Sequence, residues 1–173
     1  HMAQTKGVFQ ALMQLNLPAN QFLLMANKAL CNCFEKNRFI TLSFTLFNFA
    51  DNTLTYSRAG HCPILYYSAA TQTTQYLQSE GLGLGIIRNN SYSQYIETKT
   101  LPLAINDVFV IYTDGLIEGN SPTNKEPYGF ERLKECLESC YYLSAQEIKT
   151  FIFDDYSQYS HKSTTKDDTT LLV

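Results

Sequence analysis

An apolar run at residues 107–113 constrains the fold of this chain more than any other segment. Its sequence, DVFVIYT, is rich in β-branched and aromatic residues and carries no charge after Asp107. Such residues favour strands, and a short run of them without alternation is typical of a strand buried on both faces. We therefore predict a central strand that ends at Asp114-Gly115.

The rest of the chain divides into segments of two periodicities. Apolar residues at helical spacing predict helices at both ends of the sequence, and a spacing near two predicts strands between them. The helices are predicted at 3–15, about 19–35, about 129–140 and about 144–157. The strands are predicted at 39–50, 53–58, 63–69, 73–78, 92–99, 107–113 and 169–173. This order indicates an α+β fold in which helices pack on antiparallel strands.

Size and composition narrow the class of protein. The chain has 173 residues, 45% hydrophobic and 17% charged, which suits one folded domain. A net charge of −3 without a basic run argues against nucleic acid as a partner. No apolar run approaches the roughly 20 residues of a membrane span, so we expect no membrane contact. His1-Met2 resembles a cloning scar, which leaves a single domain at residues 3–173.

The five cysteines indicate a reducing environment. Their odd number does not predict a disulfide framework. Free thiols are typical of the cytoplasm, so we expect a cytoplasmic protein. Their spacing and the lack of nearby histidines favour small buried thiols over a zinc site.

Carboxylates stand where two predicted strands meet loops. Asp114 follows the central strand, and Asp167-Asp168 immediately precedes the last strand. If these strands are neighbours, their acids meet at one rim of the sheet, where like charges need a compensating cation. Oxygen ligands suit Mg²⁺ or Mn²⁺, which activates water and neutralises phosphate oxygens. The alternative is that Asp114-Gly115 is only a turn and the later acids only exposed loop residues.

Five segments carry recognisable motifs in a fixed order. They are R-A-G-H-C-P at 58–63, G-L-G-L-G at 81–85, T-D-G-x-x-E at 113–118, Y-G-F-E-R-L at 128–133 and K-D-D-T-T-L-L-V at 166–173. Together they resemble the SpoIIE/RsbU branch of the PPM family of metal-dependent serine/threonine protein phosphatases. Cys62, Gly83 and Thr169 depart from the family's usual residues at their positions, but none of these changes removes a ligand. The resemblance covers almost the whole chain.

The resemblance implies both a fold and a chemistry. The fold is an α-β-β-α sandwich with antiparallel sheets, and the reaction is hydrolysis of phosphoserine or phosphothreonine on a protein. The family's typical substrates are STAS-type anti-sigma-factor antagonists in bacterial signalling. Two Mn²⁺ or Mg²⁺ ions bind the phosphate and activate water. By motif position Asp114 and Asp167 are metal ligands, while Asp168 orients or supports the site.

One motif of the family does not occur in this sequence. An upstream G-D-V-x-G-K-G segment supplies the Asp that bridges both metals, and this chain contains no such segment. We therefore expect a domain truncated at its N-terminus, with at most weak metal binding and little or no activity on its own. A sheet that lacks strands exposes an edge, which favours a homodimer or a domain swap. The alternative function is a non-catalytic, phosphatase-like module that binds a protein in the same signalling context.

Other polar residues in or near these motifs allow a structural or a functional interpretation. His61 lies either near the phosphate or metal site or in a turn that it shapes, and we favour the turn. Glu118, together with Gly115, is expected to support or orient the site. Arg58 is interpreted as the cap of a strand end. Asp155 is expected to be solvated on a polar helix end.

Overall fold

The computed structural model describes residues 2–121, 126–160 and 168–173. The chain divides into two compact units. One comprises residues 1–61 and 79–103, and the other comprises residues 62–78 and 104–173. In the described ranges no helix has the length and hydropathy needed to cross a membrane.

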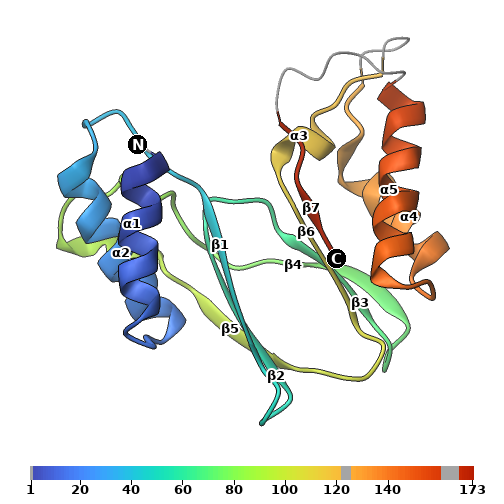
Figure 1. Ribbon diagram of the computed structural model, residues 1–173, viewed down its shortest axis with the longest axis horizontal. Helices are drawn as coiled ribbons and strands as arrows, with labels where there is room; N and C mark the ends of the chain where they lie inside the picture. The colour runs from blue at the N-terminus through green and yellow to red at the C-terminus, as the bar shows by residue number, and fades with distance from the viewer. Residues whose placement is uncertain (1, 122–125, 161–167) are drawn as a thin grey trace. The chain divides into compact units, whose positions relative to one another are not determined.

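The first unit combines two helices with a three-stranded antiparallel sheet (Figure 1). Its helices are α1 (Met2–Met13) and α2 (Ala19–Cys33). Its strands are β1 (Leu42–Asn48), β2 (Thr53–Ala59) and β5 (Thr98–Pro102), in the order β1-β2-β5. The chain turns between β1 and β2 because the Asn48 side-chain oxygen accepts from the amides of Ala50 and Asp51.

The core of the first unit lies along one stripe of α2. Phe22, Ala26 and Leu30 recur at helical spacing and are buried. They pack with Leu84 and Tyr92 from the segment before β5. Burying one such leucine contributes about 1.5–3 kcal/mol, so this stripe accounts for much of the stability of α2.

The second unit carries a four-stranded antiparallel sheet and three helices (Figure 1). Its strands are β3 (Ile64–Ser68), β4 (Thr73–Leu77), β6 (Val108–Tyr112) and β7 (Leu171–Leu172), in the order β4-β3-β6-β7. Its helices are α3 (Asp114–Ile117), α4 (Gly129–Cys140) and α5 (Ala145–Ser160). The apolar run at 107–113 therefore forms a strand with a neighbour on each side, as predicted.

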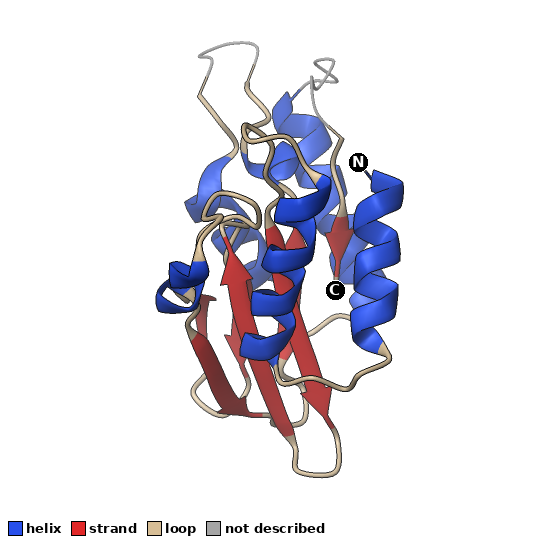
Figure 2. Cartoon of the chain, turned by 90° about the vertical axis from the view of Figure 1, so that its left-hand side faces the viewer, coloured by secondary structure: helices blue, strands red, loops and turns tan. Residues whose placement is uncertain are grey.

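Helices α4 and α5 lie side by side and bury apolar faces in the second core (Figure 1). Leu133 and Leu137 of α4 and Ile148 and Ile152 of α5 are almost completely buried. A capping box begins α5, because the Ser144 hydroxyl and amide both donate to Glu147 and the Glu147 amide donates back to Ser144. The predicted α+β fold with antiparallel sheets is confirmed, and Figure 2 shows its helices and strands.

Two local predictions were wrong. The strand predicted at 92–99 is instead a 3₁₀ helix, η1 (Asn90–Tyr95), followed by β5. The Asn89 side chain accepts from the Ser91 amide, and such local bonds compete with extended backbone. The one-turn helix α3 was not predicted at all, because Asp114-Gly115 reads as a simple turn.

Candidate metal centre

The chain turns sharply after β6 at the T-D-G motif. Thr113 is the last extended residue, and α3 begins at Asp114. The Glu118 amide donates to the Asp114 carbonyl at 2.9 Å, and the Leu116 amide donates to the Thr113 carbonyl at 3.1 Å. The Asp114 side chain is left exposed, and its Oδ1 accepts from the Gly115 amide at 3.0 Å. The turn thus presents a carboxylate at the end of a buried strand.

Strand β7 begins beside this turn (Figure 1). The Thr113 amide donates to the Thr170 carbonyl at 3.1 Å, and the Thr170 amide donates to the Thr113 hydroxyl at 2.9 Å. The same hydroxyl donates to the Asp168 carbonyl at 3.2 Å. The condition set by the sequence is therefore met, because β6 and β7 pair in antiparallel fashion and bring the backbone at 113–115 next to residue 168.

Gly115 allows the two backbones to approach. A Cβ atom at this position would lie 2.7 Å from the Asp168 carbonyl oxygen, closer than side chains normally come. Its backbone φ is not in the left-handed region, so the constraint is space rather than conformation. A glycine at 115 therefore lets the backbone that precedes β7 lie in contact with the first residues of α3.

The donors at this rim are oxygen atoms, as Mg²⁺ or Mn²⁺ requires. Asp114 and Asp168 are both exposed. Asp167, the second predicted ligand, lies outside the described residues but is bonded to Asp168 in the chain. Over the described part of the chain, no three acidic, histidine or cysteine side chains gather as a metal-binding group. The rim therefore fits a divalent cation in the type of its donors, but not in their number.

Glu118 lies one turn beyond Asp114, as the spacing predicted. It is the C-terminal cap residue of α3, its side chain is exposed, and its amide closes the turn on the Asp114 carbonyl. The backbone of Glu118 therefore closes the turn, while the expected role of its side chain at the site stays a prediction.

A tyrosine that sequence reasoning missed lies behind the turn. Tyr156 of α5 is 6% exposed, and its hydroxyl donates to the Gly115 carbonyl at 3.1 Å. A Cβ atom added at Gly119 would overlap the Tyr156 hydroxyl, so the ring also lies against the end of α3. The chain has twelve tyrosines, and Tyr156 belongs to none of the motifs, so nothing in the sequence distinguishes it from the others.

Tyr156 is adjacent to an ion pair that joins α4 to α5. Arg132 donates to both oxygens of Asp155, at 2.9 and 2.7 Å, and the Tyr128 hydroxyl donates to Asp155 at 2.7 Å. The Tyr128 ring packs edge-on against Tyr156, with centroids 5.4 Å apart. The prediction that Asp155 is solvated was therefore wrong, because a bidentate arginine and a tyrosine hold it half-buried.

The surroundings of Asp155 determine its protonation. Burial alone would raise the pKa of Asp155, but hydrogen bonds from Arg132 and Tyr128 outweigh it and lower the pKa below its ordinary value. The hydrogen bond from Arg132 to Asp155 in turn raises the pKa of Arg132. This pair is therefore ionised at neutral pH and fixes the two helices on which Tyr156 depends.

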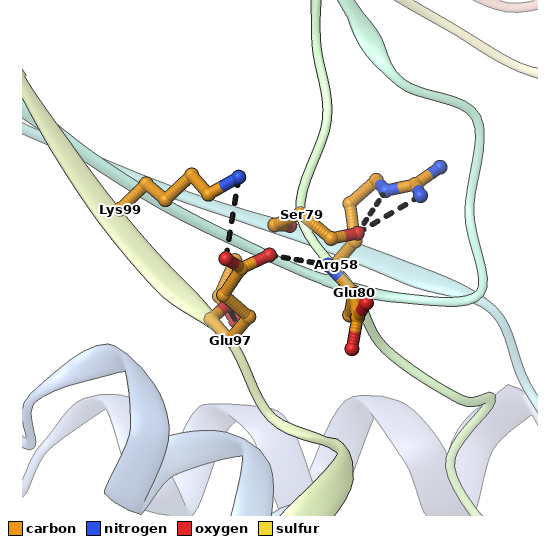
Figure 3. Close-up of polar contacts among 6 residues, drawn as sticks. Arg58, Ser79, Glu80, Glu97 and Lys99 are labelled. Carbon is orange, nitrogen blue, oxygen red and sulfur yellow. Dashed lines mark hydrogen bonds and ion pairs between the residues drawn. The ribbon is translucent and has the colours of Figure 1, made fainter.

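His61 belongs to the first unit, where its contacts fit the turn-shaping role that we favoured. Its Nδ1 lies 3.1 Å from the Thr41 hydroxyl, and its carbonyl accepts from Arg58 at 2.7 Å. Arg58 also donates twice to the Ser79 carbonyl, at 3.0 and 2.9 Å (Figure 3). Arg58, predicted to cap a strand end, thus lies near the end of β2 and binds the carbonyls of the loop residue His61 and of Ser79.

The motif that begins at Arg58 and the glycine-rich motif that begins at Gly81 meet in the first unit. The Glu97 carboxylate accepts from the Glu80 amide at 2.7 Å and pairs with Lys99 at 3.2 Å (Figure 3). A Cβ atom at Gly81 would overlap the Arg58 carbonyl, so the chain needs a glycine there. The bonded partners of this cluster are backbone groups and side chains of the same unit, which supports a structural function for the glycine-rich segment 81–85.

The fold is similar to that of PP2C-type domains of known structure. The chain is similar in structure to the SiaA-PP2C domain of Pseudomonas aeruginosa, with a TM-score of 0.85 and 13% identity over 98% of this chain and 66% of that one. It is also similar to the phosphatase domain of SpoIIE from Bacillus subtilis, presoaked with Mn, with a TM-score of 0.62 and 14% identity over 98% and 71%.

The sequence assigns the chain within this class. The model of the family "Stage II sporulation protein E (SpoIIE)" matches residues 1–173, so the chain belongs to the SpoIIE family. It is 30% identical over 156 residues to the phosphoserine phosphatase RsbU of Bacillus subtilis strain 168, covering 88% of this chain. The chain spans 44% of the length of that relative. The resemblance recognised in the motifs, to the RsbU-like branch, is thereby confirmed.

Proposed function

We propose that this chain is part of a metal-dependent phosphatase that hydrolyses phosphoserine or phosphothreonine on a STAS-type protein in bacterial signalling. The observation that carries the proposal is the pairing of β6 with β7, which brings Asp114 beside Asp168 in a chain of the SpoIIE family. The α-β-β-α layering of the sandwich and a cytoplasmic location belong to the same proposal.

In this proposal Asp114 and Asp167 hold Mn²⁺ or Mg²⁺, and Asp168 supports them. Such an ion, when bound, lowers the pKa of its water and neutralises phosphate oxygens. The chain itself supplies rigid placement. Thr113 ties the acid-bearing turn to β7, and Gly115 allows the close approach of the two backbones. Placement of this kind reduces the entropy lost when ligand and substrate are brought together.

The same proposal includes low activity of the chain by itself. It lacks the G-D-V-x-G-K-G segment, and in the described residues no third ligand accompanies the acids of the rim. Two carboxylates can hold one ion weakly but cannot clamp two. The complete centre would then need that segment, and the chain would take a phosphorylated protein as substrate only in its presence.

The test compares phosphate release from a phosphoserine protein with and without Mn²⁺. Two proteins are assayed: this chain, and a longer form that includes the G-D-V-x-G-K-G segment. We expect activity only in the longer form. Asp114→Asn and Asp167→Asn should each lower it by more than about 100-fold, since even the outer partners of metal ligands typically cost 10–100-fold. Asp154→Asn, at an exposed position of α5, is the matched control.

Two results would contradict the proposal in different ways. Activity in neither form with Mn²⁺ or Mg²⁺ would favour the non-catalytic module that captures a STAS-type partner. Full activity of the shorter chain would instead refute the claim that a further acidic ligand is needed.

A further inference from the structure

We propose that Tyr156 is a positioning residue for the Asp114 carboxylate, an inference that rests on the proposed function. Tyr156 lies on α5, and no motif of the sequence contains it. Its hydroxyl donates to the Gly115 carbonyl, the backbone group that follows the predicted ligand. The residue would act on the metal through the backbone of α3, without contact with metal or substrate.

The geometry of α3 makes this contact necessary. Helix α3 has four residues, so its carbonyls have few partners within the helix. The Asp114 carbonyl accepts from the Glu118 amide, whereas the Gly115 carbonyl receives the Tyr156 hydroxyl. Without the Tyr156 hydroxyl this carbonyl would lose its side-chain donor in a buried position, which is costly, because Gly115 is buried.

Two close contacts hold the turn, one at Gly115 and one at Gly119. On one side a Cβ atom at Gly115 would lie 2.7 Å from the Asp168 carbonyl oxygen. On another the Tyr156 ring fills the space that a side chain at Gly119 would need. Two glycines thus let β7 and Tyr156 both reach the backbone of one helical turn. A turn gripped in this way has little freedom to move its carboxylate.

Tyr156 is itself fixed by charged neighbours. The Arg132–Asp155 pair and the Tyr128 hydroxyl connect α4 to α5 one residue before Tyr156. The edge-on contact between the Tyr128 and Tyr156 rings transmits that constraint to the hydroxyl. The described contacts therefore form a continuous path from the motif Y-G-F-E-R-L to the motif T-D-G-x-x-E.

The test replaces Tyr156 by phenylalanine, which removes the hydroxyl and keeps the ring. Tyr92→Phe is the matched control, since the Tyr92 hydroxyl also donates to a backbone carbonyl, that of Leu82, at 2.8 Å, and the residue is also buried. Both variants lose one buried hydrogen bond, so similar losses of thermal stability are expected. Mn²⁺ alone is the probe, and its affinity is measured by electron paramagnetic resonance of the free ion.

Tyr156→Phe should weaken Mn²⁺ binding about tenfold, the lower end of the range for partners of metal ligands. Amide exchange at Leu116 and Glu118 should accelerate about tenfold, the factor that one ordinary hydrogen bond supplies. Tyr92→Phe should change neither. Unchanged Mn²⁺ affinity in Tyr156→Phe overturns the proposal, even if exchange accelerates, because the tyrosine is then only structural.

The two proposals fail in distinguishable ways. If the unaltered chain binds no Mn²⁺, the same measurements are made on the longer form described above. Absence of Mn²⁺ binding there contradicts the proposed function. Amide exchange at Leu116 and Glu118 still decides whether Tyr156 holds the turn. If the exchange rates are identical in Tyr156→Phe and the unaltered protein, the positioning role is overturned by that result alone.

Discussion

Replacing Gly115 by alanine tests how closely the Asp114 turn and the entry to β7 must approach. The new Cβ atom would lie 2.7 Å from the Asp168 carbonyl oxygen, against 3.4 Å for an ordinary contact. The two backbones must therefore separate by the difference, about 0.7 Å. The hydrogen bond from the Thr113 hydroxyl to the Asp168 carbonyl, now 3.2 Å, would lengthen to about 3.9 Å, which is too long to count as one.

The cost of this change follows from overpacking. Forcing one extra carbon into a close contact costs about 1–3 kcal/mol. For a chain of 173 residues each kcal/mol lowers Tm by about 2–4 °C. We therefore expect Gly115→Ala to lower Tm by roughly 2–12 °C and to weaken Mn²⁺ binding. Thermal denaturation followed by circular dichroism measures Tm, and urea denaturation measures the free energy of unfolding.

The matched control is Gly7→Ala, the same chemical change in α1. A Cβ atom at Gly7 meets nothing within 4 Å, and Gly7 lies inside a helix. Alanine there should stabilise the protein by about 0.5–1 kcal/mol, because it loses less backbone freedom on folding. If Gly115→Ala were as stable as the unaltered protein, with unchanged amide protection at Thr170, the close approach would not constrain the rim and the reasoning would be refuted.

Three further predictions concern single polar contacts. Asn27→Ala should cost about 1–3 kcal/mol in urea denaturation, because the buried side chain donates to the Ile87 carbonyl and accepts from the Gly85 amide; a change below 0.5 kcal/mol would contradict this. Ser144→Ala removes the capping box of α5 and should cost about 0.5–2 kcal/mol by the same measurement, with no loss refuting the cap. The pKa of Asp155 is lowered on folding, so its contribution to stability is present above the ordinary value of 3.8 and is lost as pH falls through the folded value. Tm measured between pH 7 and pH 3 should therefore fall less for Asp155→Asn than for the unaltered protein. An identical fall of Tm with pH in both proteins would count against the ion pair.

Local sequence was sufficient for some elements and insufficient for others. Helix α4 was predicted at about 129–140 and is observed there, because its apolar spacing depends only on local sequence. The strand prediction at 92–99 was wrong for two reasons: the Asn89 side chain accepts locally from the Ser91 amide, and the buried Tyr92 donates to the Leu82 carbonyl, ten residues away. Asp155 was placed in solvent because its partners Arg132 and Tyr128 lie 23 and 27 residues away, outside the local window.

The sequence by itself determined the class of fold, the family and the two acid-bearing strand ends. Periodicity and motifs are properties of neighbouring residues, so they are legible before the chain is folded. Tertiary structure decided that β6 and β7 pair, that Gly115 touches the backbone of Asp168 and that Tyr156 reaches the Gly115 carbonyl. These contacts join residues 41 to 61 positions apart, and only packing, not local preference, selects among the many such pairs that a chain of this length could form.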